Sequence, residues 1–152
     1  MKAIVEIPKF SFYKYEIKDE KLIIDRELKN CFENNYGYIP DTLWYDGDPI
    51  DVFILNPAPM FPGAQVEIRL IGVIECIDNG KKDDKLIGII DRSYTKKELD
   101  TLRIEIPYIY KFLNNYKKGF VAKKILNSKK ANEYYKKSVK IYERTNKRTS
   151  IK

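Results

Sequence analysis

The sequence of 152 residues contains no histidine, only two cysteines, and no apolar run of the roughly 20 residues needed to cross a bilayer. The two cysteines, Cys31 and Cys76, are too few for a disulfide framework, and we expect both to be free thiols in a reducing compartment. Without histidine, and with two isolated cysteines, a zinc site is disfavoured. The short apolar start is interrupted by Glu6 and Pro8, so no signal peptide is predicted. The sequence therefore predicts a cytoplasmic protein without a membrane segment.

The charge of the chain is unevenly distributed. Residues 117–152 hold 13 Lys and Arg and two acidic residues, a net charge of +11, which leaves −4 on residues 1–116 within the total of +7. The basic segment favours a solvated helix face, with binding to an anionic surface as the alternative. The length fits one domain, which we place at residues 1–144, followed by a disordered basic tail at 145–152.

Short strands precede helices along the chain. Apolar and alternating patterns predict strands at 5–7, 13–17, 22–25, 52–55, 66–77, 86–90 and 120–126. Residues 30–63 are expected to be rich in loops, with 52–55 as their one strand. Helices are expected after the capping-box pattern Thr95 to Glu98, around Pro107, and after Asn127 or Ser128. This order predicts the α+β class, with a small closed β-barrel and helices packed outside it.

Acidic residues gather in two places, each after or before a strand. Asp46, Asp48 and Asp51 lie within six residues, next to the apolar run at 52–55, and their mutual repulsion would be relieved by a divalent cation with oxygen ligands. An ordinary surface turn is the alternative, and an EF-hand loop is excluded because Ile50 and Pro57 occupy ligand positions. The second group, Asp78, Asp83 and Asp84, also fits a solvated hairpin loop. Together the two groups favour a site for several metal ions, with Mg²⁺ preferred.

Cations and phenols recur at strand and helix ends. Lysine, arginine and tyrosine bind phosphate oxygens through a point charge, a planar fork and a neutral hydroxyl respectively. Taken singly, these residues are ordinary surface positions; combined with the acids, they describe a site for an anionic, oxygen-rich substrate. They are Lys14, Arg26, Tyr36, Tyr116 and Lys117.

At this point the motifs resemble those of a known family. The segment from Asp46 to Val52 is similar to the signature of family I soluble inorganic pyrophosphatases. The remaining motifs agree with that family in order and spacing from about residue 4 to 125: Glu6-Ile7-Pro8-Lys9, Lys14-Tyr15-Glu16, Asp25-Arg26, Asn35 to Pro40, Pro62-Gly63, Ile71-Gly72-Val73, Asp78 with Asp83 and Lys85, and Tyr116-Lys117.

The resemblance implies a five-stranded, OB-like barrel flanked by two or three helices, assembled as a hexamer in prokaryotes or a dimer in eukaryotes. It implies hydrolysis of pyrophosphate with three to four Mg²⁺ ions, for which Mn²⁺ could substitute. It implies that Asp48 orients or deprotonates the attacking water, which bridges two metal ions. The metal ligands that it implies are Asp46, Asp51, Asp78, Asp83, Glu6 and Glu16. The groups that it implies for the phosphoryls are Lys14, Arg26, Tyr36, Lys85, Tyr116 and Lys117, of which Lys14, Arg26 and Tyr36 are also expected to act in catalysis.

The chain departs from the family pattern in two places. Phe32 and Glu33 stand where the family often has tyrosine and proline, and after Lys117 a usual Leu-Glu step is missing, so that Lys118 and Gly119 follow directly. These changes affect the hydroxyls near the site, phosphate affinity or assembly. Two other functions remain open: a non-catalytic OB-like module that binds nucleic acid, which the acidic groups disfavour, and a related hydrolase of other phosphoanhydrides.

Overall fold

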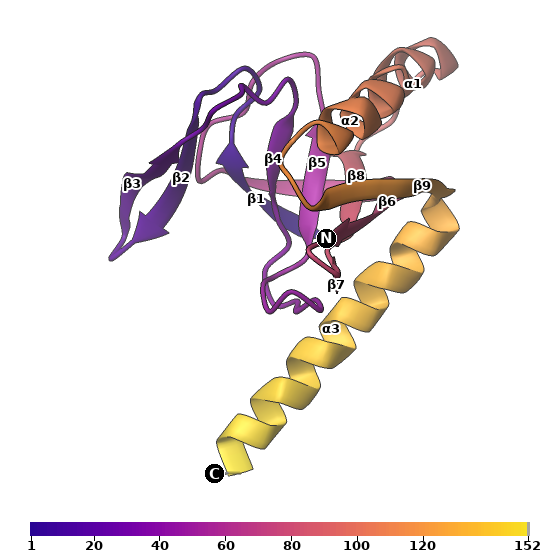
Figure 1. The fold of residues 1–152 in the computed structure, drawn as a ribbon. Coiled ribbons are helices and arrows are strands. Elements are labelled where there is room, and N and C mark those ends of the chain that lie inside the picture. The colour runs from indigo at the N-terminus through magenta and orange to yellow at the C-terminus, as the bar shows by residue number, and fades with distance from the viewer. Residues whose placement is uncertain (152) are drawn as a thin grey trace.

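The structure, a computed structural model, describes the backbone of residues 1–151 and the side chains of residues 1–148. Within these residues, nine strands and three helices follow one another (Figure 1). Their order is β1 (Lys2–Ile7), β2 (Tyr13–Lys18), β3 (Lys21–Glu27), β4 (Asn35–Tyr38), β5 (Asp51–Leu55), β6 (Gln65–Asp78), β7 (Lys81–Lys82), β8 (Lys85–Ile90), α1 (Lys96–Arg103), α2 (Glu105–Asn114), β9 (Phe120–Asn127) and α3 (Ser128–Ile151).

Five strands close into a ring in the order β1, β4, β5, β8 and β6, because β6 also pairs with β1. Only β5 and β8 are parallel; the other neighbours in the ring are antiparallel. The strands β7 and β9 extend the sheet from β6, and β2 pairs with β3 in a separate hairpin. The predicted α+β fold with a small closed five-stranded sheet and helices outside it is confirmed.

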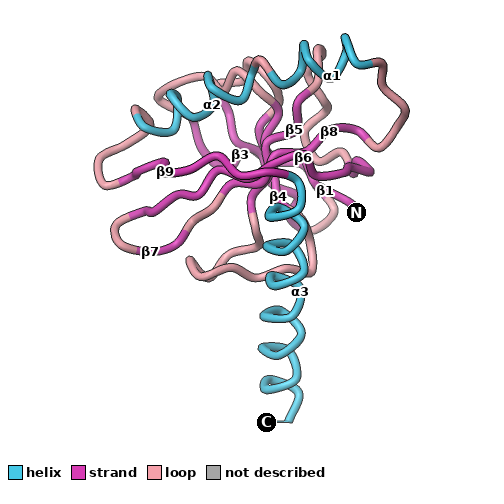
Figure 2. Tube along the Cα trace, turned by 90° about the vertical axis from the view of Figure 1, so that its right-hand side faces the viewer, coloured by secondary structure: helices cyan, strands magenta, loops and turns pink. Residues whose placement is uncertain are grey.

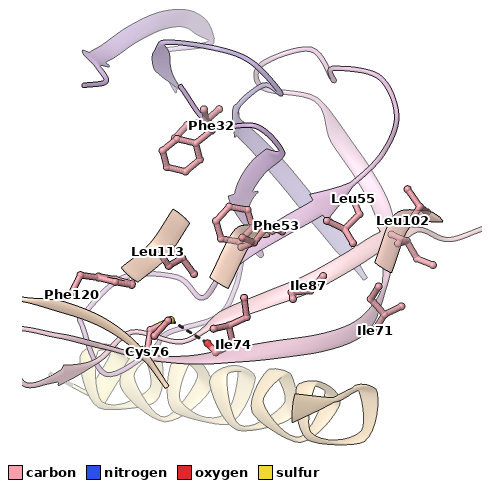
Figure 3. Close-up of a cluster of buried hydrophobic side chains, with 14 of the residues drawn as sticks. Phe32, Phe53, Leu55, Ile71, Ile74, Cys76, Ile87, Leu102, Leu113 and Phe120 are labelled. Carbon is pink, nitrogen blue, oxygen red and sulfur yellow. Dashed lines mark hydrogen bonds between the residues drawn. The ribbon is translucent and has the colours of Figure 1, made fainter. Parts of the chain in front are cut away.

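The strand β5 is buried on both faces and divides the core in two. Val52 and Ile54 pack with side chains of β1, β6 and β8 inside the ring. Phe53 and Leu55 face the other way, into a second cluster that α1 and α2 cover with side chains such as Leu113 (Figure 3). Burying each such side chain contributes about 1.5–3 kcal/mol, so this central strand fixes the position of the residues at its ends.

The helix boundaries follow the signals in the sequence. The Thr95 hydroxyl accepts from the Glu98 amide and the Glu98 carboxylate accepts from the Thr95 amide, each at 3.1 Å, so the predicted capping box begins α1. Pro107 lies in the first turn of α2, where its missing N–H costs nothing. The Asn127 side chain accepts from the Lys130 amide at 3.1 Å and thereby caps α3.

Two strands were not expected from the sequence. The stretch at 30–63 contains β4 as well as β5, although β4 has no apolar run; it forms because β1 and β5 pair with it on both sides. The strand β7 lies in the stretch taken as a loop, where Asn79 and Gly80 have φ of 50° and 84° and make the tight turn of a hairpin.

The third helix is longer than predicted. α3 has 24 residues and its helical conformation continues to Ile151, into the segment 145–152 that we predicted to be a disordered tail. After Gly119 the sequence has neither glycine nor proline to end a helix, and Thr145 bonds back to the Ile141 carbonyl at 2.9 Å. Lys152 lies outside the described residues. The C-terminal half of α3 projects away from the sheet (Figure 2).

No helix in the part of the chain that the structure describes is both long and apolar enough to cross a membrane.

Gly37 is a position where no side chain fits. A Cβ atom there would lie 1.9 Å from the carbonyl oxygen of Ile4 on the paired strand β1, and backbone cannot move aside as a flexible side chain can. We therefore expect Gly37→Ala to lower the free energy of unfolding by about 3 kcal/mol, as in strongly overpacked sites. Urea unfolding of this variant measures the loss. The control is Gly47→Ala, which meets no atom within 4 Å and carries only the strain of its φ of 88°; equal losses in both variants would contradict the steric argument.

Candidate active site

The strand register brings the acidic and basic residues to one cavity. Asp51 is the first residue of β5 and Lys85 the first of β8, and the two are directly paired in the parallel ladder. Tyr38 of β4 pairs with Asp51 on its other side. Tyr36, two residues earlier on β4, pairs with Phe53, and its hydroxyl still lies 3.0 Å from the Lys85 ammonium. On the separate hairpin, Lys14 is paired with Arg26.

A cavity of about 430 Å³ collects all but one of the predicted site residues. Those that line it are Glu6, Lys14, Arg26, Tyr36, Asp46, Asp48, Asp51, Asp78, Asp83, Lys85, Tyr116 and Lys117. The exception is Glu16, which is exposed and lines an adjoining groove of about 360 Å³ together with Lys14, Glu6 and Asp48. Asp48 thus lies where the two hollows meet.

Three carboxylates converge among the residues that line the cavity. Ligand oxygens of Asp46, Asp51 and Asp83 lie within 4.8 Å of one another, so the three groups could bind a common metal ion. They come from the loop before β5, from β5 itself and from the segment between β7 and β8. The donors are all carboxylate oxygens, which suit hard cations such as Mg²⁺.

Burial changes the proton affinity of these acids. Desolvation raises the pKa of Asp46 from its ordinary value to about 7, and that of Glu6 to about 7 against the opposing effect of Lys14. Burial also raises the pKa of Asp83, while Lys85 lowers it. These carboxylates are crowded and partly dry, which is the situation that a bound divalent cation would relieve.

A buried lysine takes the centre of the acidic group. The Lys85 ammonium donates to Asp51 at 2.5 Å, to Asp83 at 3.0 Å and to the Tyr36 hydroxyl at 3.0 Å. Burial lowers the pKa of Lys85, but Asp51 and the other partners outweigh it and hold this pKa well above its usual value. Lys85 is therefore a cation, and it shields the acids from one another.

Two more lysines that line the cavity are paired with acidic residues. Lys117 lies 3.0 Å from Asp78, and Lys14 lies 3.6 Å from Glu6 and 3.8 Å from Asp25. Every lysine that we predicted to hold phosphate thus contacts an acid in the same cavity. If a metal ion and an anionic substrate bound together, the acids could bind the metal ion and the lysines the substrate, in place of these internal ion pairs.

The structure places both departures from the family pattern, Phe32 and the short segment after Lys117, near the cavity. Phe32 lines the cavity and packs edge-on against Tyr36, with ring centroids 5.2 Å apart, so it supports that ring without adding a hydroxyl. Gly119, with φ of 86°, makes the turn that follows α2, and its carbonyl accepts from the Asn79 amide at 2.9 Å. The shortened segment still brings Lys117 to Asp78.

Sequence reasoning missed the position of Asp84. We grouped it with a solvated loop, but it is 1% exposed and bonds to the indole of Trp44. Nothing in the local sequence distinguishes it from the exposed acids beside it, since its partners lie on other segments.

Comparison with known proteins agrees with the motifs. The model of the family described as inorganic pyrophosphatase matches residues 3–148. The inorganic pyrophosphatase of Mycoplasma genitalium is 39% identical over 123 residues, which are 76% of this chain and 67% of that protein. Soluble inorganic pyrophosphatase 3 of Arabidopsis thaliana is 35% identical over 152 residues, covering 92% and 70% respectively. This chain thus spans about two thirds of the length of these relatives.

Solved structures of inorganic pyrophosphatases superpose on nearly the whole chain. The inorganic pyrophosphatase of Coxiella burnetii superposes with a TM-score of 0.81 and 27% identity, covering 93% of this chain and 94% of that one. That of Thermus thermophilus superposes with a TM-score of 0.78 and 26% identity, covering 94% and 91%. The match over residues 3–148 and the convergence of the family's motifs on one cavity lead to one conclusion: this chain belongs to the inorganic pyrophosphatase family.

Proposed function

We propose that the chain hydrolyses inorganic pyrophosphate to two orthophosphates with Mg²⁺ as its cofactor. The observation that carries this proposal is the convergence of Asp46, Asp51 and Asp83 in a cavity that is also lined by lysine, arginine and tyrosine. Such a site offers ligands for divalent cations and donors for phosphate oxygens at once. Asp78, Glu6 and Glu16 would supply further ligands, for three to four ions in all, and Mn²⁺ would be accepted in their place.

Divalent ions held by these acids would supply a nucleophilic water of lowered pKa and positive charge for the phosphoryl oxygens. Asp48 would accept the proton of that water, because its side chain is exposed where the two hollows meet. The new P–O bond forms as the bridging P–O bond breaks, and the bridging oxygen leaves on the second phosphate. No covalent bond to the protein is required.

The remaining residues would hold the two phosphoryl groups. Lys14, Arg26, Lys85 and Lys117 would neutralise their charge, and Tyr116 would add a hydroxyl. Tyr36 accepts a hydrogen bond from Lys85, which leaves its own proton to donate to the substrate. Burial raises the pKa of Tyr36 well above its usual value, so the hydroxyl stays protonated.

Assembly and location stay predictions. We propose a homo-oligomer, supported by exposed apolar side chains of the β2–β3 hairpin and by Phe61, which is 84% exposed. We also propose a cytoplasmic location, which the free thiols of Cys31 and Cys76 support, and we do not propose nucleic acid as a partner. Light scattering coupled to size exclusion measures the assembly, and a monomer at micromolar concentration would contradict it.

The direct test of the function is release of orthophosphate from pyrophosphate. We expect release in Mg²⁺, complete loss when EDTA removes the metal, and recovery when Mg²⁺ is added in excess. Tripolyphosphate and ATP serve as competing substrates in the same assay. Faster turnover of either would favour a different phosphoanhydride hydrolase, and release that persists in EDTA would exclude the proposed metal dependence.

A further inference from the structure

Asp84 is a buried acid that the reaction outlined above does not use. Its side chain has no exposed surface, and its two oxygens accept three hydrogen bonds. One oxygen accepts from the Cys76 amide at 3.0 Å; the other accepts from the indole N–H of Trp44 and from the Lys82 ammonium, each at 2.9 Å. Both oxygens of Asp84 are bonded within the protein, and Asp84 is not one of the acids whose oxygens converge, so we treat it as a structural acceptor and not as a fourth ligand.

The partners of Asp84 lie next to the acids of the cavity. Asp84 itself follows Asp83, and Cys76 lies two residues before Asp78. Trp44 lies two residues before Asp46 and closes the turn of this loop, since its amide donates to the Asp48 carbonyl at 2.9 Å and its carbonyl accepts from the Gly47 amide at 3.1 Å. The single bond between Trp44 and Asp84 therefore joins the loop that carries Asp46 and Asp48 to the segment that carries Asp83.

The helix α3 supports this connection from outside the cavity. Lys82 lies over the Tyr134 ring at 4.8 Å and 3.7 Å from Glu75, and the Tyr134 hydroxyl bonds to Glu75. The rings of Tyr134 and Trp44 are 5.5 Å apart. The indole of Trp44 thus contacts Tyr134 of α3 and Lys82 while its N–H donates to Asp84.

We infer that Trp44 and Asp84 are positioning residues, which hold the two acidic segments together so that Asp46, Asp51 and Asp83 converge before a metal ion arrives. The reason is electrostatic. Three carboxylates repel one another, and the loop at 44–48 has an exposed Gly47 and Asp48 that give it little packing of its own. A charge-assisted bond in a dry environment resists that repulsion. The inference rests on the proposed metal site and concerns its assembly.

The test removes the bond and leaves the ring. Trp44→Phe keeps an aromatic side chain but loses the indole N–H. Tyr134→Phe is the matched control, since it removes a hydroxyl that bonds to Glu75 and leaves both the Tyr134 ring and the bond between Trp44 and Asp84 in place. Binding of Mg²⁺ without pyrophosphate is measured by calorimetry, and phosphate release is measured over a range of Mg²⁺ concentrations. We expect Trp44→Phe to weaken binding and to raise the half-saturating Mg²⁺ concentration about tenfold, the effect of losing a residue that orients ligands. The kcat at saturating Mg²⁺ should change less than about twofold, and Tyr134→Phe should match the unsubstituted chain.

A second variant gives a readout that does not depend on activity. Trp44 is the only tryptophan in the sequence and is 3% exposed, so its fluorescence reports on this loop. Asp84→Asn retains one acceptor oxygen for three donors. In EDTA we expect its Trp44 emission to shift to the red and to be quenched more by acrylamide, and we expect Mg²⁺ to reverse both changes.

The outcomes separate the two proposals. If the unsubstituted chain neither binds Mg²⁺ nor releases phosphate, the proposed function is wrong. If it does both and Trp44→Phe has the same half-saturating Mg²⁺ concentration, the positioning role is wrong while the function stands. A lower melting temperature with unchanged Mg²⁺ binding would likewise reduce Trp44 and Asp84 to a structural role, and so would unchanged fluorescence in Asp84→Asn.

Discussion

Replacing Asp48 with asparagine is expected to lower kcat about 1000-fold and to leave the fold intact. A carboxylate that accepts a proton in the transition state contributes about 100- to 10,000-fold to the rate, and an amide of the same shape cannot accept that proton. The fold should survive because Asp48 is exposed, and the hydrogen bonds of its residue to Trp44 and Asp46 are made by its backbone.

The measurement is steady-state phosphate release at saturating Mg²⁺ and pyrophosphate, with the melting temperature measured beside it. Asp41→Asn is the matched control, because Asp41 is an exposed aspartate of the same segment that does not line the cavity. Its φ of 59° also suits asparagine. A kcat for Asp48→Asn within tenfold of the unsubstituted chain would show that another group takes the proton.

The second large effect is expected on stability and depends on metal. In EDTA, Lys85→Met should lower the free energy of unfolding by about 3 kcal/mol, because it removes the cation that Asp51 and Asp83 share. Mg²⁺ stabilises the folded state by binding to it, and in the variant it also restores positive charge among the acids. Saturating Mg²⁺ should therefore recover most of the loss.

Urea unfolding in EDTA and in excess Mg²⁺ gives the two free energies. Lys96→Met is the control, since Lys96 is exposed at the start of α1 and does not line the cavity. We expect it to change the stability by less than about 0.5 kcal/mol in either condition. An equal loss for Lys85→Met with and without Mg²⁺ would mean that the lysine acts by packing and not by its charge.

The sequence predicted those elements whose signals are local. The apolar run of β5, the alternation of β6 and the capping box at Thr95 are each visible within a few residues, and the structure has an element at each. The strand β4 has no such signal. Its residues form a strand because Gly37 allows the backbone of β1 to approach, a property of two segments more than 30 residues apart.

The candidate site follows the same rule. Acids at strand ends could be predicted to meet, and Asp46, Asp51 and Asp83 do meet. Two features could not be foreseen. Glu16 lines the adjoining groove and not the cavity that holds the other site residues, and Asp84 is buried because Trp44 reaches it from a position 40 residues away. Both depend on tertiary contacts that no local pattern encodes.

The projecting helix α3 also gives the molecule two electrical poles. Its 24 residues span about 36 Å and include eight basic and two acidic residues, a net charge of +6, while residues 1–116 carry a net charge of −4. Such a separation amounts to a large permanent dipole moment. At low ionic strength neighbouring molecules will attract one another head to tail, and the attraction will fade as the Debye length shortens to about 8 Å at physiological salt.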